Sequence, residues 1–119
     1  MGKKEIIIDV NTKFYNGKAK IIKSNYIESG AIALIAFYPD VIDYENESPI
    51  AFLTVNLPDY DLGKNQIIIK NWSENKGWFE SLIEAGIVKD TKIKIPTGFV
   101  EANVCELINE GLEWTKKNT

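Results

Sequence analysis

The feature that most constrains the fold is a series of short apolar runs separated by turn residues. Residues 5–10 form the first run, which is rich in isoleucine, and similar runs follow at residues 31–38, 50–56 and 66–70. Short runs of β-branched residues bounded by Gly, Pro, Asn and Asp are typical of strands. We therefore expect about four to six strands, joined by short connections, in a mostly antiparallel sheet before residue 71.

Two of these runs carry further information. Asn16-Gly17 predicts a two-residue hairpin turn, because both central positions of such a turn need a positive φ. Residues 31–38 are apolar without alternation and stop at Pro39-Asp40, which predicts a central strand buried on both faces.

The hydrophobic period lengthens after Asn71, where the sequence predicts a helix. Ser73 is the expected N-cap, and Gly86 is the expected left-handed residue at the C-terminal end. The apolar face of this helix consists of Trp78, Phe79, Leu82 and Ile83.

A further strand is expected at residues 92–95, before Pro96-Thr97-Gly98, and a second amphipathic helix at residues 103–116. The stripe of this second helix is Val104, Leu107, Ile108 and Leu112. Residues 1–119 are thus expected to form a single α+β domain, a mostly antiparallel β-sheet with two helices of the C-terminal half packed on one face.

Missing residue types exclude several chemistries. The 119 residues include no histidine and no arginine, since all 14 basic residues are lysines. The chain therefore lacks a histidine general base, a guanidinium fork and, with Cys105 as its one thiol, the usual zinc ligands. We expect no catalytic residues, no bound metal and no cofactor.

Cys105 lies between apolar neighbours, which favours a buried core thiol over a reactive one. A single cysteine suits a reducing compartment. The longest apolar run is too short to span a bilayer, and no signal-peptide cleavage pattern follows Met1-Gly2-Lys3-Lys4. The sequence therefore predicts a cytoplasmic protein without a membrane partner, as a monomer or as a homodimer formed through a strand edge.

Charge is sorted along the chain. Residues 1–27 carry six lysines and two acids, residues 28–62 carry seven acids and no lysine, and the remainder is balanced. Tyrosines stand among the acids of the middle block, and rings with regularly spaced carboxylates suit a basic protein partner. The candidate partner-binding residues are Asp40, Asp43, Tyr44, Glu45, Glu47, Asp59, Tyr60, Asp61, Trp72 and Asn75.

Other interpretations of the charged segments remain open. The acidic loops could be solvated surface that keeps a small domain soluble. The four acids between residues 40 and 47 could bind a divalent metal in an enzyme, although they lack the spacing and internal glycine of a calcium loop. Nucleic-acid binding is disfavoured by a net charge of −3, but a lysine-rich edge could support it, or could instead protect a sheet edge from aggregation. The lysines of that edge are Lys3, Lys4, Lys13, Lys18, Lys20 and Lys23.

Several segments of the C-terminal part carry a recognisable pattern. They are Leu57-Pro58, Asn71-Trp72-Ser73-Glu74-Asn75-Lys76-Gly77, Leu82-Ile83-Glu84-Ala85-Gly86-Ile87-Val88, Pro96-Thr97-Gly98-Phe99-Val100-Glu101-Ala102 and Val104-Cys105. The pattern, over residues 30–110, resembles a family of short uncharacterised bacterial proteins carried mainly on conjugative elements and prophages. The resemblance implies a setting similar to that of anti-defence genes, which include small anti-CRISPR inhibitors.

Within the most specific of these segments, Trp72, Asn75 and Trp78 have two interpretations. They could cap and pack the strand-to-helix junction, or they could form an exposed polar-aromatic patch for a partner. The function expected from sequence and resemblance together is a non-enzymatic binding protein. Its acidic, tyrosine-rich surface would occupy the basic nucleic-acid-binding site of a host protein or ribonucleoprotein complex.

Overall fold

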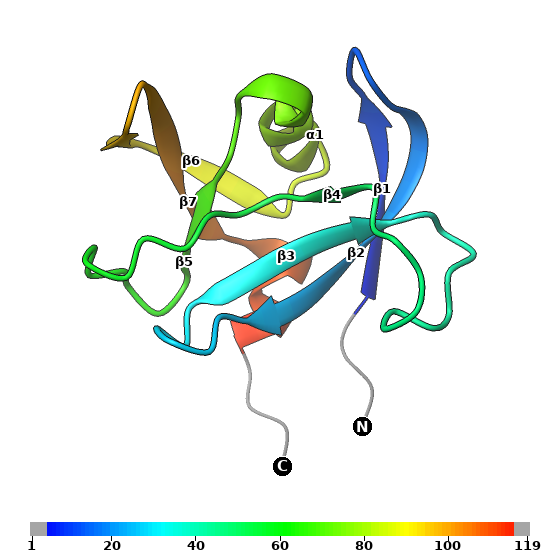
Figure 1. Cartoon of the computed structure of the whole chain (residues 1–119), viewed down its shortest axis with the longest axis horizontal. Helices are drawn as coiled ribbons and strands as arrows, with labels where there is room; N and C mark the ends of the chain where they lie inside the picture. Colours follow the sequence, from blue (N-terminus) through cyan, green and yellow to red (C-terminus); the bar gives the residue numbers. More distant parts are fainter. Residues whose placement is uncertain (1–4, 116–119) are drawn as a thin grey trace.

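The computed structural model describes residues 5–115, and most of its strands lie where short β-branched runs predict them (Figure 1). In chain order the elements are β1 (Glu5–Asn11), β2 (Asn16–Asn25), β3 (Ile32–Phe37), β4 (Ala51–Phe52), β5 (Gln66–Ile69), η1 (Ser73–Asn75), α1 (Trp78–Glu84), β6 (Val88–Thr97), β7 (Val100–Leu107) and η2 (Asn109–Thr115). The predicted α+β class and mostly antiparallel pairing are confirmed.

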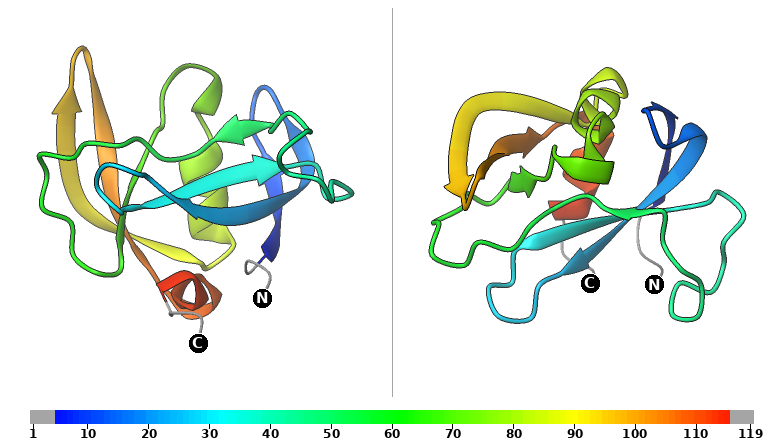
Figure 2. Two further views of the ribbon diagram at one scale, coloured as in Figure 1. Left: turned by 60° about the horizontal axis from the view of Figure 1, so that its bottom comes forward. Right: turned by 45° about the horizontal axis from the view of Figure 1, so that its top comes forward.

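The strands divide between two antiparallel sheets rather than forming one. The first has the order β1-β2-β3-β4 and the second has the order β5-β7-β6. A bridge between Thr54 and Ile69 connects them, with the Val55 amide donating to the Ile68 carbonyl at 3.0 Å. Because α1 packs against both β1 and β6, the helix lies between the two edge strands of the arrangement (Figures 1 and 2).

The main core lies between the sheets and α1. Strand β1 alternates strictly, so that Ile6, Ile8 and Val10 are buried while the intervening side chains are exposed. On α1, the predicted apolar face is confirmed for Trp78, Phe79 and Leu82, which are buried, whereas Ile83 is partly buried and packs against the same core. Cys105 is completely buried, as expected of a core thiol.

A smaller apolar cluster lies on the outer face of the first sheet, the face turned away from α1. Ile22 of β2 and Phe37 of β3 are buried there together with Val41 from the loop after β3. Val41 and, beside it, the partly buried Tyr44 therefore hold the loop after β3 against the outer face of the first sheet.

The predicted helix at residues 103–116 is wrong. Residues 100–107 form strand β7, which pairs with both β5 and β6, and a short 3₁₀ helix follows it. Residues 102–105 are buried in succession, because a central strand is covered on both faces and loses the alternation that identifies a strand. Lys116, the last residue of the predicted helix, lies outside the described residues.

The first hairpin turn also differs from the prediction. The Thr12 amide donates to the Tyr15 carbonyl at 2.9 Å, so the two turn residues are Lys13 and Phe14. Thr12 Oγ1 accepts hydrogen bonds from the amides of Phe14 and Tyr15, at 3.1 and 2.9 Å, which takes the place of Asn-Gly turn chemistry. Gly17 lies within β2 instead.

Helix α1 begins later than expected. Ser73 belongs to the 3₁₀ turn η1, and Gly77, with a φ of 101°, is the residue that precedes the helix. A Cβ on Gly77 would lie 2.9 Å from Thr12 Cγ2, so the close approach of helix and hairpin needs glycine. Gly86, with a φ of 75°, follows the helix end as predicted.

Candidate protein-binding surface

The strongest candidate site is the loop of residues 38–47, called the acidic loop below, which follows β3. Val41 of the loop is buried on the outer face of the first sheet, and the ring of Tyr44 lies 4.9 Å from the ring of Phe37, between centroids. The Tyr44 hydroxyl also donates a hydrogen bond to the Glu5 carboxylate at the start of β1. The loop is therefore fixed to three strands or their ends by side chains of its own.

A buried lysine holds the same loop from below. Lys20 of β2 is 8% exposed, and its Nζ donates to the Val41 carbonyl at 2.7 Å. The ammonium group lies 3.9 Å from Glu5 Oε1 and 5.6 Å from the centroid of the Tyr44 ring. Because a buried charge is tolerated only when it is paired and hydrogen-bonded, these contacts explain both the burial of Lys20 and the position of the loop.

The tyrosine in this cluster stays protonated over the physiological range. Partial burial, then the hydrogen bond to Glu5, then the charge of that carboxylate raise the pKa of Tyr44 to about 12. Tyr44 thus acts as a permanent donor to Glu5 and as an anchor of the loop. The contacts of Tyr44 with Phe37 and Glu5 therefore give this candidate contact residue a structural role in holding the loop.

Asp43 has an internal role as well. Its two carboxylate oxygens accept hydrogen bonds from the Asn46 side-chain amide at 2.6 Å and from the Glu45 backbone amide at 3.3 Å. Its backbone carbonyl accepts from the Glu47 amide at 3.1 Å. Asp43 therefore shapes the turn that presents the acids on either side of it.

The remaining acids of the loop are free. Asp40, Glu45 and Glu47 are exposed, and within residues 5–115 their carboxylates have no hydrogen bond or ion pair. Ile42 lies among them with 88% of its surface exposed, and the ring of Tyr38 is half exposed. An exposed aliphatic side chain in a loop that also carries unpaired carboxylates is suited to a basic protein partner.

Tyr38 connects this surface to the core through a row of rings. Its ring contacts Tyr15 edge-on at 5.7 Å, and Tyr15 stacks on the buried Trp78 at 6.0 Å. Burial, with smaller contributions from the neighbouring Tyr38 and the charge of Asp40, raises the pKa of Tyr15. Tyr38 and Asp40 are therefore neighbours at the end of an ordered aromatic stack.

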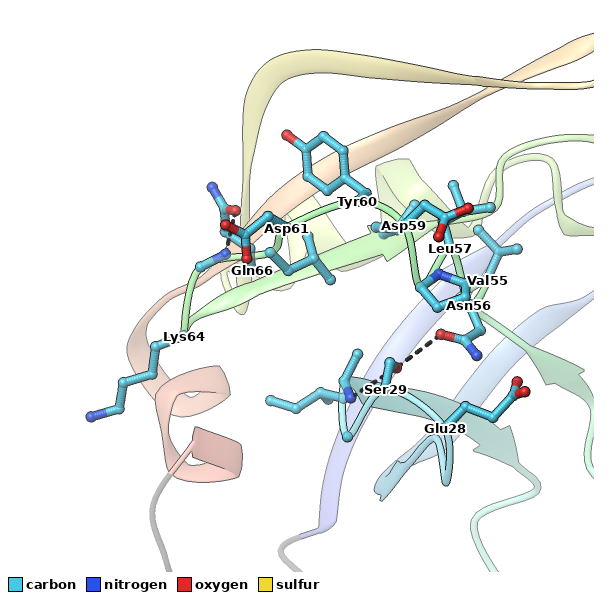
Figure 3. Close-up of a pocket in the computed structure, with 17 residues that line it drawn as sticks. Glu28, Ser29, Val55, Asn56, Leu57, Asp59, Tyr60, Asp61, Lys64 and Gln66 are labelled. Carbon is cyan, nitrogen blue, oxygen red and sulfur yellow. Dashed lines mark hydrogen bonds between the residues drawn. The ribbon is translucent and has the colours of Figure 1, made fainter.

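The second acidic segment lies at the opposite end of the molecule, in the loop between β4 and β5 (Figures 1 and 2). Asp59 and Asp61 line a pocket of about 480 Å³, here called the acidic pocket, whose other wall is the turn between β2 and β3. Glu28 in that turn adds a third exposed carboxylate, and Ser29 Oγ donates to Asn56 Oδ1 at 2.9 Å across the pocket (Figure 3).

Tyr60, between the two aspartates, turns away from Glu28 and Ser29 (Figure 3). Together with Ile95 and Pro96 of β6 it lines a separate hollow of about 340 Å³. The structure therefore brings Asp59 and Asp61 together with Glu28. It does not bring the loop between β4 and β5 close to the acidic loop (Figure 1). The two acidic segments, whose relative position the sequence did not decide, therefore form two separate acidic surfaces.

Of the two interpretations of the segment at the start of the helix, the exposed polar-aromatic patch does not describe Asn75 and Trp78. Asn75 is 7% exposed, and its Nδ2 donates to the Phe52 carbonyl at 2.6 Å, which ties η1 to β4. Trp78 is 1% exposed in the main core, and Trp72 is partly buried. Asn75 and Trp78 therefore pack the strand-to-helix junction, as the structural interpretation of the segment has it, although neither η1 nor α1 has a side-chain cap.

Other potential sites offer little chemistry. Among residues 5–115, no three His, Cys, Asp or Glu residues are grouped so that they could hold a metal ion. Burial in β7, with a further contribution from Asp90, raises the pKa of the Cys105 thiol to about 12, so it stays protonated at neutral pH. Over the same described residues, no helix is both long and apolar enough to cross a membrane.

Several residues of these surfaces were not predicted from the sequence. Ile42 was not among the candidate contact residues, and the hydrogen bond from Lys20 to the loop was not expected. Glu28 was recognised as part of the acidic block but was not assigned to a site. An isoleucine between acidic residues in a loop is the signal that could have identified Ile42. A comparison of the chain with known protein families, curated proteins and solved structures gave no significant match.

Proposed function

We propose that this chain is a non-enzymatic binding protein of a mobile genetic element that inhibits a host defence complex, in the manner of an anti-CRISPR protein. The acidic loop would occupy a basic, nucleic-acid-binding surface of that complex. The mobile-element setting rests on the sequence resemblance. The observation that supports the binding mode is an anchored loop that carries three unpaired carboxylates and the exposed Ile42.

Fixed geometry makes the acidic loop the better of the two acidic surfaces for this role. Lys20, Val41 and Tyr44 hold the loop before any partner arrives, so little conformational entropy is lost on binding. Free carboxylates speed association with a basic surface, and Ile42 supplies apolar area at the centre of the contact.

The lysines of the first third support nucleic-acid binding less well. Lys20 is buried and bonded to Val41, and Lys18 pairs with Asp9 at 2.8 Å. Lys3 and Lys4 lie outside the described residues. Of the described lysines of this edge, only Lys13 and Lys23 have no ion pair, so the edge offers fewer free charges than the acidic loop.

The test compares two triple variants that remove the same charge. The first neutralises the acidic loop (Asp40→Asn, Glu45→Gln and Glu47→Gln), and the second neutralises the acidic pocket (Glu28→Gln, Asp59→Asn and Asp61→Asn). Tagged proteins are used for affinity capture from nuclease-treated lysate of a bacterium that carries defence systems. We expect a defence or nucleic-acid-processing protein to be retained by wild type and by the pocket variant and lost by the loop variant.

Purified partner then allows the salt dependence of the dissociation constant to be measured. The loop variant should show a weaker salt dependence than wild type, because it lacks the charges that counterions screen. Equal retention by both variants, or capture of nothing by wild type, would contradict the proposal.

A further inference from the structure

Strand β1 is an edge strand with an open side. It pairs with β2 alone, and its other edge faces α1 and η2. The opposite edge of the arrangement, β6, contains Pro96, three exposed lysines and a bulge between Asp90 and Ile93, which are devices that prevent another strand from pairing. Strand β1 has no proline, lysine or bulge, so its edge is not blocked in this way.

The alternation of hydrogen-bonded residue pairs between β1 and β2 shows which backbone groups of β1 point outward. Thr12 and Tyr15 form a hydrogen-bonded pair, and every second residue of β1 counted back from Thr12 does the same. Ile8 and Ile6 are therefore residues that exchange hydrogen bonds with β2. Asp9 and Ile7 therefore direct their amides and carbonyls away from β2. Asn11 follows the same alternation, because its backbone amide points away from β2 and donates to Ser81 Oγ of α1 at 3.5 Å.

The outward groups of Ile7 and Asp9 open into a groove. Residues 6–9 form one wall of this hollow of about 350 Å³, and Glu84, Ala85 and Glu110 form the other. Within the described residues, no hydrogen bond is made by the outward amides of Ile7 and Asp9. The groove runs along roughly 10 Å of strand, enough for a short extended segment.

Charge decides between possible occupants. Glu84 and Glu110 are exposed at the groove, and none of the residues that line it is a lysine; Asp9 on the other wall is paired with Lys18 at 2.8 Å, so the two glutamates carry the free charge of the groove. A second copy of this chain would add a β1 strand that contains no basic residue to pair with these glutamates. A basic segment would instead be attracted.

We propose that the edge of β1 from Ile6 to Asp9 accepts an extended, lysine- or arginine-bearing peptide segment of a partner protein as an added strand. Backbone hydrogen bonds to Ile7 and Asp9 would supply affinity, and Glu84 with Glu110 would select basic side chains. The site is separate from the acidic loop and does not depend on the function proposed above.

The test is a titration of the labelled protein with a short synthetic peptide of alternating lysine and valine, followed by NMR. We expect shifts centred on Ile7 and Asp9, and slower amide exchange at both residues on binding. The same peptide with its lysines replaced by glutamate should not bind. Absence of binding by the lysine peptide, or shifts confined to the acidic loop, would overturn the proposal.

A pair of variants isolates the backbone contact. Ile7→Pro removes one outward amide without removing a bond to β2, whereas Ile7→Thr keeps that amide. Peptide binding should be lost in the first variant and retained in the second. Glu84→Gln with Glu110→Gln should weaken binding by about twofold to fivefold per charge.

Two further outcomes are informative. Should Ile7→Pro not fold, a peptide N-methylated on the residues that face β1 should fail to bind wild type. If the N-methylated peptide bound as tightly as the unmodified peptide, the proposal that the peptide adds a strand to β1 would be overturned. Concentration-dependent dimerisation that Ile7→Pro abolishes would assign the edge to a second copy and would also overturn the proposal.

Discussion

The acidic loop and the acidic pocket present the same number of free carboxylates but are built differently. Each presents three exposed carboxylates that are unpaired within residues 5–115. The loop is fixed by the buried Val41, by the ring of Tyr44 and by Lys20, whereas one side-chain hydrogen bond among the described residues, from Ser29 to Asn56, spans the pocket. The same number of free carboxylates therefore belongs to one anchored surface and to one lightly connected surface.

Anchoring, more than acidity, therefore distinguishes the acidic loop from the acidic pocket. In the acidic loop, Val41 and Tyr44 pack against the first sheet and hold the backbone, while Asp40 and Ile42 are exposed. In the pocket, Tyr60 turns toward β6 and leaves the neighbouring aspartates without a comparable anchor (Figure 3). The two regions should respond differently to the same substitutions.

The largest expected difference comes from removing the tyrosine of each region. Tyr44→Ala deletes the contact with Phe37 and the hydrogen bond to Glu5, so we expect a loss of about 2 kcal/mol in the free energy of unfolding. Tyr60→Ala should cost about 1 kcal/mol or less, because its ring borders an open hollow. Urea denaturation of both variants measures this, and equal losses would contradict the difference in anchoring.

The next effect concerns the lysine beneath the loop. Lys20→Met keeps the aliphatic stem but leaves the Val41 carbonyl without its donor, and we expect a loss of about 1–2 kcal/mol. The matched control is Lys18→Met, which breaks the exposed pair with Asp9 and should change stability by less than about 0.5 kcal/mol. A Lys20→Met protein as stable as the control would show that the ammonium group does not anchor the loop.

A smaller effect depends on pH. An unfolded tyrosine titrates near pH 10, whereas Tyr44 keeps its proton in the folded protein until about pH 12. The stability from this raised pKa is complete below pH 10 and is lost as the pH rises from about 10 to about 12. Tyr44→Phe should lose about 0.5–1 kcal/mol at neutral pH and should show a shallower decline above pH 10. Parallel stability curves for the two proteins would refute this.

Much of the fold could be predicted because it depends on local pattern. Strand β1 alternates on one face, and the helical stripe at Trp78, Phe79 and Leu82 matches the buried face of α1. Residues 104 and 107 have helical spacing, yet they lie in β7, since pairing with β5 and β6 outweighs the local pattern. Thr12 likewise replaced the expected Asn-Gly turn through side-chain hydrogen bonds that a pattern does not reveal.

The candidate site could be predicted in composition but not in arrangement. The sequence identified the acids of both segments, because charge is read directly from residue type. Their separation depends on which loops the strand order brings together, and the role of Lys20 depends on a contact 21 residues away along the chain. Asn75 is a residue for which composition misleads: it is polar and was listed as a candidate contact residue, but its hydrogen bond to Phe52 of β4 accompanies its burial.

The smallest expected effect is at the pocket itself. Ser29→Ala removes the hydrogen bond to Asn56 and a second one from the Ala31 amide, both at exposed positions. Because water can replace both partners, the free energy of unfolding should fall by only a few tenths of a kcal/mol. Hydrogen exchange should nevertheless quicken at residues 28–31 and stay unchanged in the acidic loop, which does not share this contact. A loss comparable to that of Lys20→Met would mean that the pocket is as firmly built as the loop, and the distinction between the two acidic regions would then rest on Ile42 alone.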